Sequence, residues 1–144
     1  GVQAEGANAI ARSFREKCLV CTDSASTIAD GIAVKQPGVN TFELVSKYVD
    51  DIALVTEDEI SSAILALIEK QKMIAEGAGA VSVAAAMHHK FPLEGKRVVS
   101  VISGGNIDVT SLSRVIERGL IKSGRSSQLT IELIDKLPDL PEKR

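Results

Sequence analysis

Short apolar runs occur at three places in the chain, and each is followed by a segment with helical periodicity. The runs lie at residues 2–5, 52–56 and 98–102. Apolar runs of this length that alternate with helical patterns are typical of strands in a parallel sheet. The pattern therefore predicts an α/β fold, an open and mainly parallel sheet of three or more strands flanked by helices.

The clearest helix signal begins at Thr56. Thr56 and Glu59 fit a capping box, in which the threonine hydroxyl accepts from the backbone N–H of Glu59 and the glutamate carboxylate reaches back. Apolar residues then recur near a period of 3.6 residues, at Ile60, Ile64, Leu67, Ile68 and Ile74. This spacing predicts an amphipathic helix.

Weaker patterns predict the remaining elements. Helices are expected at residues 41–49 with Thr41 as the cap, at 81–87, and after Asn106 as far as Gly119 or Gly124; a loop is expected at 22–38 and a half-buried strand at 129–133. The composition changes at residues 123–127. We therefore expect one domain over residues 1–125 and a separate segment over 126–144.

Composition and charge exclude several classes of function. With 144 residues, of which 44% are hydrophobic, the chain is long enough for one globular domain with a core. Its 17 basic and 19 acidic residues give a net charge of -2 without a dense basic run, so nucleic acid is not an expected partner. Charged residues interrupt every apolar stretch before the roughly 20 residues that span a bilayer, and residues 1–5 lack the basic segment and apolar core of a secretory signal. We expect a cytoplasmic protein that does not bind membranes.

Two pairs of residues have metal-binding or redox side chains. Cys18 and Cys21 have the C-x-x-C spacing of a redox pair or half a zinc site, but no second pair lies at zinc-site spacing. We favour two reduced thiols in a segment packed on the domain. His88 and His89 are adjacent, so on a helix they point about 100° apart and cannot share a metal. We interpret them as surface residues at a helix end.

Candidate ligand-binding residues follow the third apolar run, at Ser103-Gly104-Gly105-Asn106. Ligands of open α/β sheets bind where strands end, and the glycines allow a flat ligand to approach the backbone while Ser103 and Asn106 offer hydrogen bonds. An ordinary strand-to-helix turn would explain the same residues about as well.

Three acidic residues flank apolar segments: Glu5, Asp30 and Glu76. Glu76 ends an apolar helical face, where an unpaired carboxylate would be costly. It is either a functional residue or a glutamate turned to solvent at a helix break. Glu5 and Asp30 are likewise either functional or simple cap and turn residues.

Taken together, the motifs from residue 1 to about 125 resemble the C-terminal part of the serine/threonine dehydratase family, which are fold-type II pyridoxal-phosphate enzymes. The matching motifs are GVQAE at 1–5, TIADG at 27–31, VDDI at 49–52, VTEDEI at 55–60, AEGAG at 75–79 and SGGNID at 103–108. Their order and spacing make the match specific. GVQ and EGAG are typical of the threonine dehydratases within this family.

The resemblance implies a cofactor and a reaction for the complete protein. It would bind pyridoxal 5'-phosphate and, as a homo-oligomer, deaminate L-threonine to 2-oxobutanoate and ammonia, in amino-acid metabolism such as isoleucine biosynthesis. Ser103, beside Gly104, would meet the pyridine nitrogen; Glu76 would support the cofactor, and Gly31 would lie in a loop beside the ring. A neutral serine hydroxyl leaves a milder electron sink than an aspartate would, which suits β-elimination.

The resemblance also implies that part of the catalytic machinery lies outside this chain. In the family the Schiff-base lysine and the glycine-rich phosphate loop precede the position of Gly1, and Lys35, Lys72 and Lys122 do not stand in the Schiff-base context. The chain also opens directly on an apolar run. We expect it to begin inside a domain, to be inactive alone, and to expose an apolar surface where the missing N-terminal half docks.

Two other family features are incomplete in this sequence. Glu5 and the carbonyl of Ala9 match two cation-ligand positions of the serine racemases, but Ala11 replaces the carboxylate of the third, which argues against a tight magnesium or calcium site. Residues 128–135 resemble the first strand of a regulatory ACT domain without the turn that should follow. We interpret residues 126–144 as a linker and a remnant of such a domain.

Two alternative functions stay open. A serine dehydratase or racemase of the same fold would take L-serine, because the residues that bind the substrate carboxylate lie mostly in the missing half. A non-catalytic regulatory module that binds an amino acid or a nucleotide would need the chain to function without that half.

Overall fold

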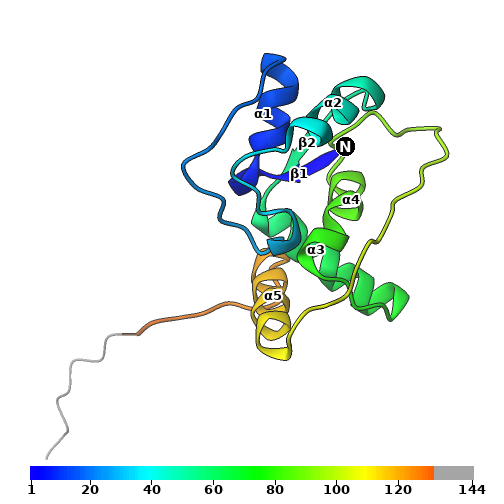
Figure 1. The fold of residues 1–144 in the computed structure, drawn as a ribbon. Coiled ribbons are helices and arrows are strands. Elements are labelled where there is room, and N and C mark those ends of the chain that lie inside the picture. The colour runs from blue at the N-terminus through cyan, green and yellow to red at the C-terminus, as the bar shows by residue number, and fades with distance from the viewer. Residues whose placement is uncertain (132–144) are drawn as a thin grey trace, which may run out of the picture.

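Two parallel strands form the short sheet of this protein, whose computed structural model describes residues 1–131. β1 (Val2–Ala4) pairs with β2 (Ala53–Val55), and Val2 lies opposite Ala53. Parallel strands require a long crossover, which here contains α1 (Ala9–Glu16) and α2 (Val39–Tyr48). Figure 1 shows the sheet surrounded by helices. The predicted α/β class and the parallel pairing of the first two apolar runs are confirmed.

The third apolar run, residues 98–102, does not form a strand, so this prediction is wrong for the chain. It lies in an extended segment that leaves the helices after α4 (Gly77–Met87) and returns at α5 (Val109–Lys122) (Figure 1). Val99 is 90% exposed, and within residues 1–131 no strand pairs with the run. The physical reason is that an apolar run becomes a strand only where a neighbouring strand takes up its backbone hydrogen bonds.

α3 (Glu57–Ala66) begins where the capping box predicted. The hydroxyl of Thr56 accepts from the backbone N–H of Glu59 at 3.3 Å, and the Glu59 carboxylate accepts from the backbone N–H of Thr56 at 2.8 Å. The helix continues into a π-helical turn, η3 (Leu67–Gln71), and ends at Lys72, whose φ is 57°. The prediction that the helix reaches Ile74 was therefore too long.

The other predicted helices exist; α2 and α4 begin earlier than expected, and α5 follows Asn106 as predicted. α2 starts after Gly38, so Thr41 is not its cap. α4 starts at Gly77 because the glycine-rich segment forms its first turn. α5 starts after Asp108, whose carboxylate accepts from the backbone N–H of Ser111 at 2.9 Å. Residues 22–38 are loop, as predicted, apart from the short 3-10 turn η2 (Asp30–Ile32).

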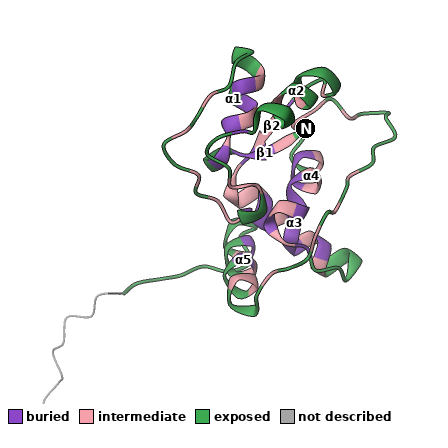
Figure 2. Cartoon of the chain, in the orientation of Figure 1, coloured by how far each residue is buried: buried purple, intermediate pink, exposed green. Residues whose placement is uncertain are grey.

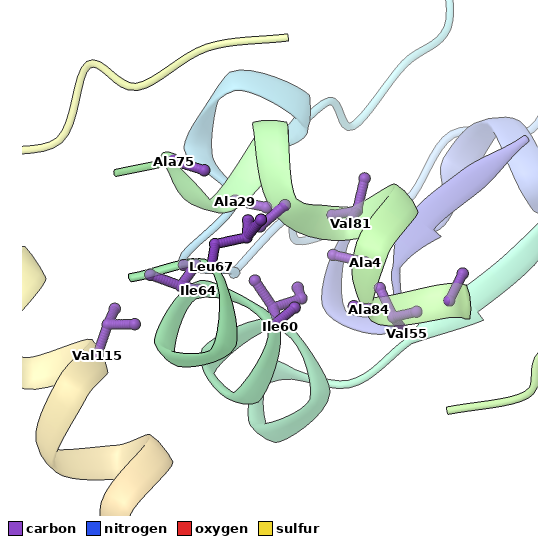
Figure 3. Close-up of a cluster of buried hydrophobic side chains, with 13 residues drawn as sticks. Ala4, Ala29, Val55, Ile60, Ile64, Leu67, Ala75, Val81, Ala84 and Val115 are labelled. Carbon is purple, nitrogen blue, oxygen red and sulfur yellow. The ribbon is translucent and has the colours of Figure 1, made fainter. Parts of the chain in front are cut away.

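The hydrophobic core lies between α3, α4 and the two strands. Ile60, Ile64 and Val55 are fully buried, and Val81 and Ala84 of α4 pack on them (Figure 3). α3 packs against both α4 and α5, and α4 also contacts both strands. Figure 2 shows buried residues on α3, α4 and one face of α1, whereas the extended segment is largely exposed. α4 consists mostly of glycine, alanine and valine, which lets its neighbours approach closely.

Several surface predictions can be compared with the structure. His88 and His89 are exposed at the end of α4, as predicted. Both cysteines are free and exposed, and their segment is held to α1 through the backbone N–H of Val20, which donates to the buried hydroxyl of Ser13 at 2.9 Å.

Near the C-terminus, residues 129–131 are exposed and not in a strand, and the remainder of the predicted strand and ACT-like remnant lies outside the described residues. None of the helices in residues 1–131 is long and apolar enough to cross a membrane.

Candidate functional site

Three segments that are far apart in the sequence meet at the N-terminus of α4. We call this place the junction; it comprises residues 28–31, 76–79 and 103–106. Glu76 precedes α4, and its backbone N–H donates to the carbonyl of Gly104 at 3.1 Å. Its carboxylate accepts from the backbone N–H of Asn106 at 3.1 Å. Glu76 therefore holds the loop of residues 103–106 through both its main chain and its side chain.

The junction can form only because some of its positions lack a side chain. A Cβ at Gly104 would lie 2.6 Å from Oε1 of Glu76, and a Cβ at Gly79 would lie 2.5 Å from the carbonyl oxygen of Gly104. Both distances are shorter than real Cβ contacts. The glycines at positions 79 and 104 thus allow the backbone of the loop to touch α4 directly.

The structure brings together three of the four predicted cofactor residues. Gly31 lies against α4, since a Cβ at this position would be 3.1 Å from the Cβ of Ala78 and 3.7 Å from Oε1 of Glu76. Gly104 contacts the same carboxylate. Ser103 is exposed beside Gly104, and no described residue hydrogen-bonds its hydroxyl, which is left available to a ligand.

A groove of about 750 Å³ adjoins the junction and separates it from α5. Its lining includes Glu76, Asn106 and Asp30 from the junction and several residues of α5. Asp58 joins the α5 wall to α3 through ion pairs with Arg118 at 2.7 Å and Lys122 at 3.2 Å. The hydrogen bonds from Arg118 and Lys122 hold the pKa of Asp58 below its ordinary value. The pKa of Asp108, at the mouth of the groove, is lowered by its hydrogen bonds with Ser111.

Glu5 and Ala9, the residues that match cation-ligand positions of the serine racemases, have other surroundings in this structure. Glu5 is exposed, and the carbonyl of Ala9 accepts from the hydroxyl of Ser13 at 2.8 Å. The backbone N–H of Ala11 donates to the buried side chain of Gln3 at 2.7 Å. Within residues 1–131, no group of three His, Cys, Asp or Glu side chains is placed to hold a metal ion.

Comparison with known proteins places the chain in a family. The family model described as "Pyridoxal-phosphate dependent enzyme" matches residues 1–104. The chain belongs to this family. The resemblance inferred from its motifs is thereby confirmed.

The chain is similar to curated proteins and solved structures of this pyridoxal-phosphate family. An L-threonine ammonia-lyase of Thermotoga maritima is 49% identical over 142 residues, which are 99% of this chain and 35% of the relative. Among solved structures, a threonine deaminase isoform of Solanum lycopersicum is 32% identical with a TM-score of 0.76, covering 84% of this chain and 34% of the other. A maize serine racemase is 29% identical with a TM-score of 0.70, covering 81% and 38%. The chain thus spans about a third of the length of the relatives it matches.

The residues at the junction fit the cofactor of this family. A flat pyridine ring needs a surface without protruding side chains and a hydrogen-bond donor for its nitrogen. Gly104 and Gly31 let the backbone of their loops lie directly against Glu76 and Ala78, and the exposed hydroxyl of Ser103 stands next to Gly104. Ser103 and Gly104 could meet the ring, whereas Glu76 could only support it, because its carboxylate is already hydrogen-bonded to the loop.

One residue that contacts the junction, Glu57, was not predicted from the sequence to do so. Glu57, the first residue of α3, accepts a hydrogen bond from the backbone N–H of Ile28 at 2.8 Å. The acidic run after Thr56 was explained by helix capping, and nothing in the sequence marks Glu57 as a partner of a loop residue 29 positions away. Only the tertiary structure brings the two together.

Proposed function

We propose that this chain forms one wall of the cofactor site in a pyridoxal-phosphate-dependent lyase. The complete enzyme would deaminate L-threonine to 2-oxobutanoate and ammonia. The observation that carries the proposal is the junction, where Glu76 fixes a Ser-Gly-Gly-Asn loop against α4 in a chain whose relatives are named threonine ammonia-lyases. The residues selected by the motif resemblance include Gly31, Glu76 and Gly104, which meet at the junction and support the proposal.

In this proposal each residue of the chain has a limited role. Ser103 donates its hydroxyl hydrogen to the ring nitrogen or shares a proton with it, and stays neutral. Glu76 keeps the loop in place so that the hydroxyl is correctly oriented. Gly104 lets the loop that carries Ser103 pack against Glu76, and Gly31 lets its own loop pack beside Ala78. The cofactor, when bound, supplies the electron sink for removal of the α-proton and loss of the β-hydroxyl.

The apolar run of residues 98–102, within the extended segment between α4 and α5, is the proposed contact with the rest of the protein. Val98, Val99 and Val101 are exposed here, although a valine-rich run is suited to a buried parallel strand. The hydroxyl of Ser82 donates to the carbonyl of Val101 at 2.8 Å, which holds the run beside α4. We propose that strands outside this chain pair with the run and cover it. From the resemblance alone, we further propose a cytoplasmic homo-oligomer in amino-acid metabolism such as isoleucine biosynthesis.

Substitution of Ser103 in the complete protein tests the proposed function. Ser103→Ala should lower threonine turnover by roughly tenfold to a thousandfold, the range expected from losing one to a few kcal/mol of transition-state stabilisation. Ser103→Asp should favour a protonated ring, shift the visible absorbance of the bound cofactor and increase side reactions relative to elimination. Cofactor content should stay unchanged in both variants, because the covalent and phosphate contacts lie elsewhere.

A matched control is Ser113→Ala, which removes an exposed hydroxyl from α5 outside the junction. It should leave turnover and absorbance unchanged. If both Ser103 variants also behave like the unaltered protein, Ser103 is only a turn residue. Absence of both cofactor and turnover from the unaltered protein would instead favour a non-catalytic binding module.

The similarity to a serine racemase favours a second candidate, an enzyme of the same fold that acts on serine. Steady-state rates with L-threonine and L-serine, together with chiral analysis of residual serine, distinguish the candidates. A higher kcat/KM for L-threonine supports the first proposal. Formation of D-serine or a clear preference for L-serine supports the second.

A further inference from the structure

The loop of residues 22–38 brings Asp30 and Gly31 to the junction. Near the junction, several of its hydrogen bonds are local: the backbone N–H of Ala29 donates to the Thr27 hydroxyl at 3.1 Å, and that of Ile32 donates to the Ala29 carbonyl at 3.0 Å. Such bonds shape the loop without fixing its position. The bond from the backbone N–H of Ile28 to the carboxylate of Glu57 is different, because it joins the loop to α3.

Glu57 is well placed to fix that position. Thr56 and Glu59 form the capping box of α3, so the side chain of Glu57 has no capping hydrogen bond to make. One and two turns later, Ile60 and Ile64 are fully buried in the core and immobilise the helix. The carboxylate of Glu57 is therefore an acceptor on a rigid support, as positioning residues need to be.

The second carboxylate oxygen of Glu57 shows that this position is not optimised for stability alone. Oε1 is buried, and none of the described residues donates a hydrogen bond to it. A buried carboxylate oxygen without a donor lowers the free energy of unfolding. The compensating benefit is the bond that the other oxygen, Oε2, makes to the loop.

The residues that follow Ile28 pack directly against the junction. A Cβ at Gly77 would lie 2.8 Å from the Cα of Ala29, so the loop backbone rests on the first turn of α4. Ala29 is fully buried there. Two residues later, Gly31 lies beside Ala78 and the Glu76 carboxylate. A shift of Ile28 must therefore alter the surroundings of Glu76.

We propose that Glu57 is a positioning residue for the cofactor site: its carboxylate holds the loop that carries Gly31 against Glu76. The inference rests on the proposed function, because only a bound cofactor gives the loop a catalytic role. Glu57 itself lies behind the loop and acts through Ile28. The hydrogen bond needs only an acceptor, so an amide oxygen should replace the carboxylate.

The test compares three variants of the complete protein. Glu57→Ala removes the acceptor, Glu57→Gln keeps one, and Glu59→Ala is the matched control that breaks the capping box two residues away. The measurements are hydrogen exchange of the Ile28 amide, the absorbance and circular dichroism of bound pyridoxal phosphate, and kcat and KM for threonine.

We expect a pattern that loss of stability alone would not produce. Glu57→Ala should speed exchange of the Ile28 amide by about tenfold or more, as expected for losing a hydrogen bond to a charged acceptor, and should raise KM by about tenfold with altered cofactor dichroism. Glu57→Gln should stay within about threefold of the unaltered protein in each measurement. Glu59→Ala should lower the Tm but leave Ile28 exchange and the dichroism unchanged.

Two outcomes overturn the inference while the proposed function stands. One is unchanged Ile28 exchange in Glu57→Ala; the other is equal effects of Glu57→Ala and Glu59→Ala on KM and dichroism. Failure of the proposed function is recognised separately, from an unaltered protein that binds no cofactor, and it overturns the inference as well.

Discussion

α3 and the extended segment between α4 and α5 each contain an apolar run, and the two runs have different structures. Both were predicted to be regular elements, one a helix after Thr56 and the other a strand at residues 98–102. The helix formed, and the strand did not. A helix satisfies its backbone hydrogen bonds within itself, whereas a strand depends on a neighbour. The difference shows that a sequence pattern predicts an element reliably only where the hydrogen-bond partners of that element lie close in the sequence.

The two regions also differ in how far their apolar side chains are buried. Ile60 and Ile64 of α3 are fully buried against α4 and the strands, all of which are present in the chain. Val99 and Val101 are 90% and 69% exposed, with the Ser82 hydroxyl as one anchor to α4. In the proposed complete protein, residues outside this chain would cover these valines.

The largest expected effect concerns Val99. If other strands cover the segment, Val99→Asp buries an unpaired carboxylate and should destabilise the complete protein by about 2–5 kcal/mol. Val109→Ala is the control, because Val109 is exposed at the start of α5 and should cost less than about 0.5 kcal/mol. Urea unfolding gives both values. A Val99→Asp variant as stable as the control would mean that the segment stays exposed in the complete protein. A missing neighbouring strand would then not explain why residues 98–102 form no strand.

A smaller effect is expected at the start of α3. Thr56→Ala removes the hydroxyl of the capping box and should lower the free energy of unfolding by about 1 kcal/mol. Thr41→Ala tests the rejected cap of α2 and should change it by less than about 0.5 kcal/mol. Chemical denaturation with a constant m-value measures the difference. Equal costs at both threonines would contradict the assignment of the capping box.

The smallest effect concerns the ion pair that links the two regions. Glu59 of α3 lies 2.7 Å from the ammonium of Lys90, just after α4. Burial raises the pKa of Glu59, but the hydrogen bonds from Lys90 and the Thr56 backbone outweigh it, and the net pKa is below its ordinary value. The folded state therefore gains stability above the ordinary glutamate pKa and loses it as the pH falls through the folded value.

Lys90→Ala should accordingly cost about 1 kcal/mol or less at neutral pH and reduce the loss of stability on acidification. Lys96→Ala, an exposed lysine of the same segment, should change neither. Unfolding curves between neutral pH and pH 3 provide the measurement. An unaltered acid response in Lys90→Ala would show that the pair contributes nothing measurable.

The sequence predicted those parts of the fold whose causes are local. The capping box located the first turn of α3, and the loop predicted at residues 22–38 ends where α2 begins. Element ends were less accurate: Gly77 begins α4 although glycine disfavours helices, because that turn is stabilised by close packing against the loop at Ile28 and Ala29. The π-helical turn at Leu67–Gln71 had no recognisable pattern.

The candidate site was predictable as a set of residues but not as an arrangement. Motif resemblance selected Gly31, Glu76, Ser103 and Gly104, and the first, second and fourth meet in the structure. Their roles stay predictions until the variants are measured. Glu57 was missed because its partner is a backbone N–H, which has no sequence signature.

The contacts at Gly77 and Gly79 have a mechanical consequence. Elsewhere in a protein a small displacement is absorbed when side chains change rotamer, but here backbone rests on backbone and no rotamer is available. The loop, the first turn of α4 and the Ser-Gly-Gly-Asn segment must therefore move as one stiff body. A ligand or subunit contact that displaces one of these three segments should therefore displace the other two by a similar amount.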